Sequence, residues 1–485
     1  MSRDPMQSVI VIGAGVNGLV AAHTLAGAGR RVLVLEQRSD TETDASPNVG
    51  WVPPQVVKEL SLDTHGFAVR RTDPWISSAL PDGSRLELWH DVGRSAEAIR
   101  RLSLADAAKW PEFCARMRKL GSVLEALYVV PPTDVETTDP MELLRLAGLG
   151  LRVRRLGKQG MIDLLRILPM AVAELLDDWF ASDALKGVLG AAGVTHLHQG
   201  PRSGGTAFGL LHHHVGSPTG VFRPPVSNVS QVLSALPGIE IRRGATVTGI
   251  TLKDGRATGV VLAGGEEIAA SQIASSADPR RTMLGLAAPG WLDPEFALAV
   301  RNIKCRGVAA TVTLTVDRAP DFSTLLIAPS LEYLERAYDD AKYGRVSTHP
   351  WLEARADGNR VIVHAQYAPY ELADGSWDDA RRKALGDLVV ERLTERAPSL
   401  RSAITAREVL TPADLERRYG LTEGHAYQGE LTLDQILFMR PVPNWGHYRT
   451  PITGLFLCGA GTHPGGAIAG ASGRNAAREI LHGKD

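Results

Sequence analysis

Cysteine is scarce in this sequence: Cys114, Cys305 and Cys458 are the only three in 485 residues. An odd number of widely separated cysteines forms no disulfide framework and no Cys-x-x-Cys metal site. This usage excludes a small secreted module held by disulfides, and it is typical of proteins from a reducing compartment.

Long apolar runs are also absent. A membrane-spanning helix needs ~20 mostly apolar residues. The stretch at 450–473 lacks Asp, Glu, Lys and Arg, but it contains seven glycines and two prolines. The apolar run at 9–12 is too short for a signal peptide. We therefore expect a soluble, cytoplasmic protein.

The sequence has no excess of positive charge, because 53 Lys and Arg residues nearly balance 54 Asp and Glu residues, for a net charge of −1. Nucleic-acid-binding surfaces are usually basic, so we expect no nucleic-acid partner.

Glycine is abundant, with 49 of 485 residues, or about 10%, against a usual ~7%. This abundance predicts loops that approach a ligand closely. At 485 residues the chain is too long for one compact domain, and we expect at least two.

The first forty residues have the pattern of a dinucleotide-binding βαβ unit. Residues 9–12 are apolar and β-branched, as in a strand buried on both faces, and a helix is predicted at 19–28. A second strand is predicted at 31–36. The connection at 13–18 is Gly-Ala-Gly-Val-Asn-Gly, the fingerprint of a phosphate-binding turn at a helix N-terminus.

Each glycine of this turn has its own predicted role. Gly13 permits the tight turn, Gly15 lets the backbone approach a pyrophosphate, and Gly18 lets the helix pack closely on the strand. Glu36 ends the second strand, where an acid can bind a pair of ribose hydroxyls. It favours a free 2′-hydroxyl over NADP, whereas these residues alone do not distinguish FAD from NAD.

The middle of the chain alternates between helical and strand-like patterns. Residues 95–192 are mostly helical in pattern. A three-stranded meander with glycine-containing turns is predicted at 245–270, and a further strand at 271–275. Beyond it, a strand is predicted at 360–366 and a helix at 377–396.

A second glycine-rich loop lies near the C-terminus. An apolar strand at 454–458 enters the loop at 459–473, which opens a helix at 474–481. So many glycines are costly in chain entropy. The loop therefore indicates a second place where backbone N–H groups and a helix N-terminus face a flat or anionic ligand.

Three stretches, at 9–36, 244–282 and 419–477, resemble the FAD-binding parts of the phytoene desaturase family, and they occur in the same order. The last contains Cys-Gly-Ala-Gly-Thr-His-Pro-Gly-Gly at 458–466. The nearest branch is that of the phytoene-dehydrogenase-related oxidoreductases, within the amine-oxidase-like flavoproteins. The resemblance implies an α/β fold whose Rossmann-type FAD-binding domain is assembled from discontinuous segments.

The resemblance also implies domain limits and a cofactor. Residues 1–75, 225–290 and 425–485 are expected to form the FAD-binding domain, and residues 76–224 and 291–424 an inserted α+β substrate domain. The implied cofactor is FAD. The residues expected to bind it are Gly13, Ala14, Gly15, Asn17, Gly18, Glu36, Gln37, Val247, Gly459, Ala460, Gly461, Gly466, Ala467 and Ile468.

Two segments depart from the family pattern. Relatives carry an Arg-x-Gly-Gly turn shortly after the ribose-binding acid, but residues 38–48 contain no glycine pair. Relatives also carry a glycine pair where residues 223–229 have Arg-Pro-Pro-Val-Ser-Asn-Val. These departures leave open whether the flavin is held as firmly as in relatives.

Candidates for chemistry lie mostly near the C-terminus. His463 stands inside the glycine-rich loop, and it is either close to the cofactor and substrate or bonded to the loop backbone. Tyr427 and Arg440 flank the matching segment and are candidates to orient the substrate. Three consecutive histidines at 212–214 point in different directions and have no acid or cysteine cluster nearby, so we expect no metal site.

The resemblance implies an FAD-dependent desaturase or dehydrogenase that moves a hydride from a largely hydrophobic organic substrate to the flavin. Only one dinucleotide fingerprint is present, so electrons are expected to leave to dioxygen, a quinone or another protein. The altered turn at 38–48 motivates two alternatives: a flavin-scaffolded isomerase or cyclase without net redox change, and a binding protein with a vestigial flavin fold.

Residues 141–155 are apolar and basic, which suits either peripheral membrane contact or a helix that caps the substrate cavity. The substrate and the oligomeric state stay open.

Overall fold

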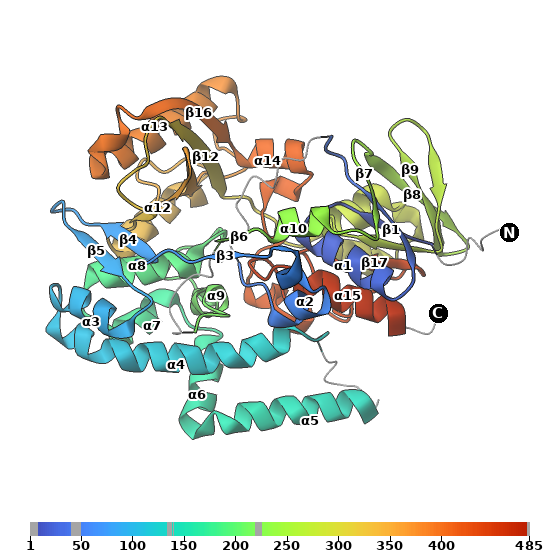
Figure 1. The fold of residues 1–485 in the computed structure, drawn as a ribbon, viewed down its shortest axis with the longest axis horizontal. Helices are drawn as coiled ribbons and strands as arrows, with labels where there is room; N and C mark the ends of the chain where they lie inside the picture. The colour runs from blue at the N-terminus through green and yellow to red at the C-terminus, as the bar shows by residue number, and fades with distance from the viewer. Residues whose placement is uncertain (1–7, 40–49, 133–137, 139, 219–225, 483–485) are drawn as a thin grey trace.

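A parallel sheet of five strands brings together parts of the chain that are far apart in sequence (Figure 1). The computed structural model describes residues 8–39, 50–132, 138, 140–218 and 226–482. Strand β1 is central in this sheet and is followed along the chain by helix α1. The strand order is β17 (Leu455–Leu457), β11 (Gln272–Ser275), β1 (Ser8–Ile12), β2 (Arg31–Leu35) and β7 (Glu240–Arg242).

Strand β1 is buried on both faces, as its apolar sequence predicts. Val9 and Val11 pack with the helices α1 (Val16–Gly27) and α15 (Ala471–His482). Ile10 and Ile12 face the opposite way and pack against the antiparallel meander. The predicted Rossmann-type α/β fold is thereby confirmed.

The predicted meander is confirmed as the antiparallel strands β8 (Val247–Lys253), β9 (Arg256–Leu262) and β10 (Glu267–Ala269). The turn between β8 and β9 needs two residues with positive φ, and Asp254 and Gly255 supply them with φ values of 51° and 74°. Most of the altered turn after Glu36, residues 40–48, lies outside the described residues, as do residues 223–225 of the second departure.

A mixed sheet of seven strands forms the second large body (Figure 1). One of its faces is apolar, because Val312, Ala354 and Val363 pack there with residues of helix α13 (Asp379–Arg396). The strand order is β16 (Ile404–Leu410), β12 (Ala309–Val316), β15 (Arg360–Gln366), β14 (Leu352–Asp357), β13 (Thr324–Ile327), β4 (Ile76–Ala79) and β5 (Arg85–Leu88).

A layer of helices lies beside this sheet, and the helical pattern predicted for residues 95–192 is confirmed there. These helices are α3 (Val92–Arg100), α4 (Leu104–Tyr128), α5 (Pro140–Arg155), α6 (Gly157–Ile167), α7 (Val172–Trp179), α8 (Asp183–Val194), α9 (Thr206–His213) and α12 (Leu331–Lys342). Among the described residues, the remaining α-helices and strands are α2 (Pro54–Glu59), β3 (Val69–Arg70), β6 (Val226–Ser227), α10 (Val229–Ala235), α11 (Pro294–Arg301) and α14 (Pro412–Tyr419).

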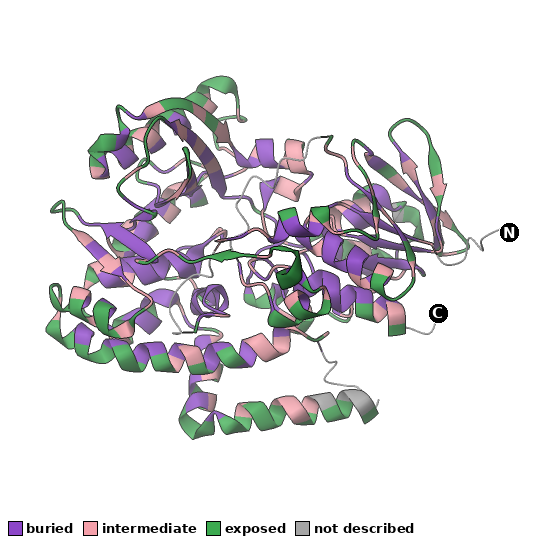
Figure 2. Ribbon diagram, in the orientation of Figure 1, coloured by how far each residue is buried: buried purple, intermediate pink, exposed green. Residues whose placement is uncertain are grey.

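Helix α5 lies at the edge of the molecule, with much of its surface exposed (Figure 2). Its apolar side chains Leu143, Leu144 and Leu151 are exposed rather than packed into a core. Within the described ranges, no helix is both long enough and apolar enough to cross a membrane.

Candidate active site

A cavity of about 420 Å³ lies where the parallel sheet, the two glycine-rich loops and the seven-stranded sheet meet. One part of its wall is the turn before α1 together with the end of β2. Another part is the face of the seven-stranded sheet, represented by Thr311, Ile362 and His364. Residues of the segments 424–428 and 459–469 lie on the wall as well.

The three glycines of the first turn differ in what surrounds them. A Cβ on Gly18 would lie 2.2 Å from the carbonyl oxygen of Gly13, and a Cβ on Gly13 would lie 2.4 Å from Oγ of Ser276. A Cβ on Gly15 would meet nothing within 4 Å. Gly13 and Gly18 therefore serve the packing of the chain itself, whereas Gly15 opens into the cavity. Gly15 is also the N-cap of α1, where no side chain caps the helix and free N–H groups suit a phosphate.

Glu36 presents a fixed carboxylate at the end of β2. Its Oε2 accepts a hydrogen bond from the backbone N–H of Ala14 at 2.8 Å. Its Oε1 accepts from the backbone N–H of Arg38 at 3.0 Å and from Nε of the same residue at 3.3 Å. The side chain is buried yet lines the cavity, so this acceptor geometry fits the predicted ribose hydroxyls.

The second glycine-rich loop is pressed between neighbouring segments. A Cβ on Gly466 would lie 2.0 Å from the ring of Tyr427, and a Cβ on Gly459 would lie 2.4 Å from Oε1 of Gln428. Ala467 has a φ of 65°, in the left-handed region, and its carbonyl accepts from the backbone N–H of Trp51 at 2.9 Å. The loop therefore brings bare backbone to the cavity wall, as a flat ligand requires.

His212 holds this loop in place from behind. Its Nε2–H donates to the carbonyl of Gly466 at 2.6 Å, and its Nδ1 accepts from the hydroxyl of Tyr128 at 2.7 Å. A carbonyl only accepts, so Nε2 carries a proton, and in the neutral ring Nδ1 is then the acceptor. Burial lowers the pKa of His212 to about 4, which keeps the ring neutral at neutral pH.

His213 and Tyr427 form a hydrogen-bonded pair on the cavity wall. The Nδ1–H of His213 donates to the carbonyl of Gly209 at 2.8 Å. When the ring is neutral, Nε2 accepts from the hydroxyl of Tyr427, 2.9 Å away. The ring of His196 packs against Tyr427 with centroids 4.5 Å apart. This arrangement can move a proton between a phenol and an imidazole beside a bound substrate.

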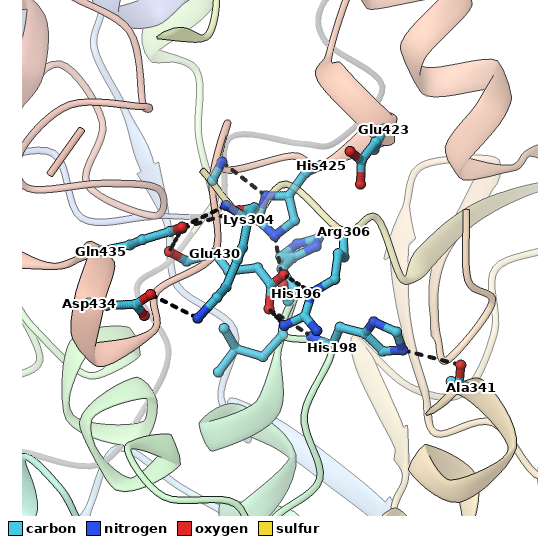
Figure 3. A network of polar contacts seen from close by, with 12 residues as sticks. His196, His198, Lys304, Arg306, Ala341, Glu423, His425, Glu430, Asp434 and Gln435 are labelled. Carbon is cyan, nitrogen blue, oxygen red and sulfur yellow. Dashed lines mark hydrogen bonds and ion pairs between the residues drawn. The ribbon is translucent and has the colours of Figure 1, made fainter. Parts of the chain in front are cut away.

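The segment that carries Tyr427 is anchored by His425 and Glu430 (Figure 3). The Nε2–H of His425 donates to the carbonyl of His196 at 2.8 Å, and its Nδ1 accepts from the backbone N–H of Tyr427 at 3.2 Å. Burial lowers the pKa of His425 to about 4. The buried carboxylate of Glu430 accepts two hydrogen bonds from the guanidinium of Arg306, at 2.7 and 2.9 Å.

Of the three residues predicted to be catalytic, Tyr427 lines the cavity, while Arg440 and His463 are not among its described lining residues. The guanidinium of Arg440 is buried and bonded to backbone carbonyls. His463 is also buried, and its Nε2–H donates to the carbonyl of Leu127 at 3.1 Å. The structure therefore places both residues where they support the wall.

Most residues predicted to bind the cofactor are on the cavity wall. The exceptions are Ala14, whose N–H is bonded to Glu36, and Gly461, whose N–H donates to Oε1 of Gln428 at 2.9 Å. Those on the wall are Gly13, Gly15, Asn17, Gly18, Glu36, Gln37, Val247, Gly459, Ala460, Gly466, Ala467 and Ile468.

The sequence did not reveal a polar group on the sheet face of the cavity. Glu353, Arg355 and His364 lie there, together with His196. The available signal was the alternation of polar and apolar residues along β14 and β15, which places polar side chains on one face.

None of the three cysteines is among the residues that line the cavity. Burial raises the pKa values of Cys114, Cys305 and Cys458 to about 12, so these thiols remain protonated. In the part of the chain that the structure describes, no three His, Cys, Asp or Glu side chains gather as a metal-binding group.

Residues 8–478 match the family described as FAD dependent oxidoreductase. The chain belongs to this family. The predicted FAD cofactor and oxidoreductase class are thereby confirmed, and the backbone around Gly15 and Gly466 fits such a cofactor. The phytoene desaturase branch and the roles of individual residues stay predictions.

Similar proteins align with nearly the whole of this FAD-dependent oxidoreductase. It is 32% identical to the pyridine nucleotide-disulfide oxidoreductase domain-containing protein 2 of Rattus norvegicus, over 98% of this chain and 94% of the relative. It is 25% identical to a subunit of limonene dehydrogenase from Castellaniella defragrans, over 99% and 95% of the two chains. The solved structure of putrescine oxidase bound to putrescine has 15% identity and a TM-score of 0.58, over 98% and 99% of the chains, and shows the likeness of fold.

Gly15→Val tests the cofactor-binding turn of this oxidoreductase. Because nothing lies within 4 Å of the added Cβ, we expect the melting temperature of the FAD-free protein to stay within about 2 °C of wild type. The valine occupies the space of the pyrophosphate, so bound FAD, measured by absorbance, should fall at least about tenfold. Gly27→Ala, also without neighbours within 4 Å, is the control. Full FAD occupancy in Gly15→Val would contradict the assignment.

The buried histidines predict a pH-dependent stability. His212, His425 and His463 have pKa values lowered to about 4 by burial, below about 6.5 in the unfolded chain. The unfolded state therefore binds more protons between these values, and the free energy of unfolding should decrease as pH falls through this window. Each histidine contributes up to about 1.4 kcal/mol per pH unit there, and nothing above about pH 6.5.

Urea unfolding at several pH values measures this slope. His425→Gln should reduce it by up to about 1.4 kcal/mol per pH unit, and His482→Gln, at an exposed position, should leave it unchanged. An unfolding free energy that stays constant from about pH 7 to about pH 5 would show that the buried rings do not remain neutral.

Proposed function

We propose that this oxidoreductase dehydrogenates a largely hydrophobic organic substrate at a carbon–hydrogen bond. The supporting observation is one continuous cavity, which begins at the phosphate-binding turn, passes the glycine-rich loop at Gly466 and reaches the seven-stranded sheet. Apolar residues such as Val308, Leu415 and Leu421 line it together with the polar groups. The substrate is thus received beside the part of the wall that suits a flavin ring.

The residues on this wall have separable tasks. When bound, FAD supplies a two-electron acceptor for a hydride from the substrate. The backbone at Gly15 and the carboxylate of Glu36 would hold the nucleotide half. Tyr427 would orient the substrate and exchange a proton with Nε2 of His213 through their hydrogen bond.

The relative named as a limonene dehydrogenase component supports oxidation at carbon rather than at a heteroatom. Because the sequence has one dinucleotide fingerprint, we propose that electrons leave to dioxygen or a quinone. A redox-neutral isomerase or cyclase and a vestigial binding protein are the competing functions, and each gives a different spectroscopic result.

The visible spectrum of the purified protein is the first test. We expect a flavin band whose intensity corresponds to about one FAD per chain. Under anaerobic conditions a substrate should bleach this band, and Tyr427→Phe should slow bleaching by about tenfold or more, because the proton-exchanging hydroxyl is lost. Tyr343→Phe, at an exposed position, is the control.

Two outcomes favour the competing functions. Conversion of a substrate to an isomer without bleaching would support the redox-neutral enzyme. A protein that stays colourless after addition of FAD, and converts no substrate, would support the vestigial binding protein.

We also propose that helix α5 makes peripheral contact with a membrane surface. Leu143, Leu144 and Leu151 are exposed on it, and basic residues occupy its last turn. This combination is typical of helices that lie in the headgroup region of anionic lipids.

Sedimentation with phosphatidylserine-containing vesicles tests this contact. Leu144→Glu with Leu151→Glu should reduce the bound fraction by about fivefold or more, because two apolar anchors become charged. Leu298→Glu, at an exposed position on α11, should have no effect. Equal sedimentation of all three proteins would show that α5 is not the contact.

A further inference from the structure

A band of polar side chains crosses the sheet that closes one side of the cavity. Strands β12, β15 and β14 lie side by side, with Thr311 opposite His364 and His364 opposite Glu353. In the next row Ile362 is opposite Arg355. All five side chains line the cavity. The opposite face of the same strands is the apolar core, so the polar groups are confined to the cavity side.

Glu353 and Arg355 form an ion pair that uses only two of the three guanidinium nitrogens. Glu353 is 3% exposed, and its Oε1 accepts from both Nε and Nη2 of Arg355, at 2.9 and 2.6 Å. A guanidinium has five N–H donors in a planar fork. Nη1 of Arg355 donates to no residue within the described ranges, and the side chain lines the cavity. The cavity wall therefore presents N–H donors of the charged Arg355 side chain that have no acceptor among the described residues.

His364 connects this donor to the reactive part of the site. Gln366 donates through Nε2 to the carbonyl of Val194 at 2.7 Å, which fixes its amide and presents Oε1 to Nε2–H of His364, 3.0 Å away. The ring of His364 packs on His196, with centroids 4.8 Å apart. His196 in turn packs on Tyr427. Arg355 is one row along the same sheet face from the Glu353–His364 pair, so a group held by Arg355 lies next to the row from which these ring contacts lead to Tyr427.

We propose that the substrate carries a carboxylate, and that Nη1 of Arg355 binds it. A carboxylate accepts the N–H groups that otherwise remain unpaired in a low-dielectric cavity. A hydrocarbon leaves them unpaired, and an ammonium group offers no acceptor to Nη1. This inference rests on the proposed function and names its substrate class as an organic acid with an apolar body.

Equilibrium binding to the FAD-loaded protein tests the proposal without requiring turnover. The probes are octanoate, octanol and octylamine, which share one chain length, and the readout is perturbation of the bound-flavin spectrum together with equilibrium dialysis. Octanoate should bind at least about tenfold more tightly than the other two, because only it accepts a charge-assisted hydrogen bond from Arg355. Arg355→Gln should weaken octanoate binding by about tenfold to a hundredfold. Octanol binding should change less than about twofold.

Matched variants separate recognition from folding. Arg360→Gln removes an exposed arginine of the same sheet and should leave octanoate binding unchanged. If Arg355→Gln fails to fold because the carboxylate of Glu353 loses its guanidinium partner, Glu353→Gln provides a second test, since freeing Nε and Nη2 should tighten octanoate binding by several fold. The double variant lacks both charges and should fold but bind octanoate weakly.

The results that overturn the proposal are distinct from failure of the proposed function. Equal affinities for the three probes, or octanoate binding that is indifferent to both Arg355→Gln and Glu353→Gln, would overturn the carboxylate site even in a flavin-loaded, active enzyme. Selective octanoate binding by a protein whose flavin no substrate reduces would support this site and contradict the dehydrogenase function.

Discussion

The buried guanidinium of Arg440 is the constraint around which the active site is arranged. Burial lowers the pKa of Arg440 to about 10, so the side chain is still charged at neutral pH and needs an acceptor for each N–H. Those acceptors are the carbonyls of Tyr427, Gly429, Glu430, Gln435 and Ala460. Leaving such donors unpaired costs about 1–3 kcal/mol each or more. The segment 427–435 must therefore wrap around the guanidinium, which fixes Tyr427 against the glycine-rich loop.

The neutral histidines extend this arrangement by joining segments that are far apart in the chain. His212 links α4 and α9 to Gly466, and His425 links the segment of Tyr427 to the carbonyl of His196. Each neutral ring donates with one nitrogen and accepts with the other, and protonation of His425 would place a second ring N–H against the backbone N–H of Tyr427. Networks of this kind are stiff while every member is satisfied. The wall is consequently shaped before any ligand binds, which lowers the ordering cost of binding.

The parts of the site that the sequence predicts are those determined by local backbone conformation. The turn at 13–18 and the meander follow from strand and glycine patterns within a few tens of residues, and both are confirmed by the fold. The position of Arg440 is different, because its acceptors depend on how 427–435 and the loop at 460 meet in space. Glu353 and His364 were not predicted at all, since their pairing depends on the register between β14 and β15.

The cavity wall has an apolar part and a polar part, and together they restrict the chemical class of the substrate more than either part does alone. The resemblance to desaturases predicts a largely hydrophobic substrate, and Val308, Leu415 and Leu421 provide an apolar lining. A wholly apolar ligand, however, would bury Nη1 of Arg355 without giving it an acceptor. A small polar ligand would forgo the apolar contacts that supply most of the binding free energy. The proposed organic acid, an elongated molecule with an apolar body and one anionic end, would satisfy both surfaces, and its anionic end would fix which carbon–hydrogen bond is presented to the glycine-rich loop.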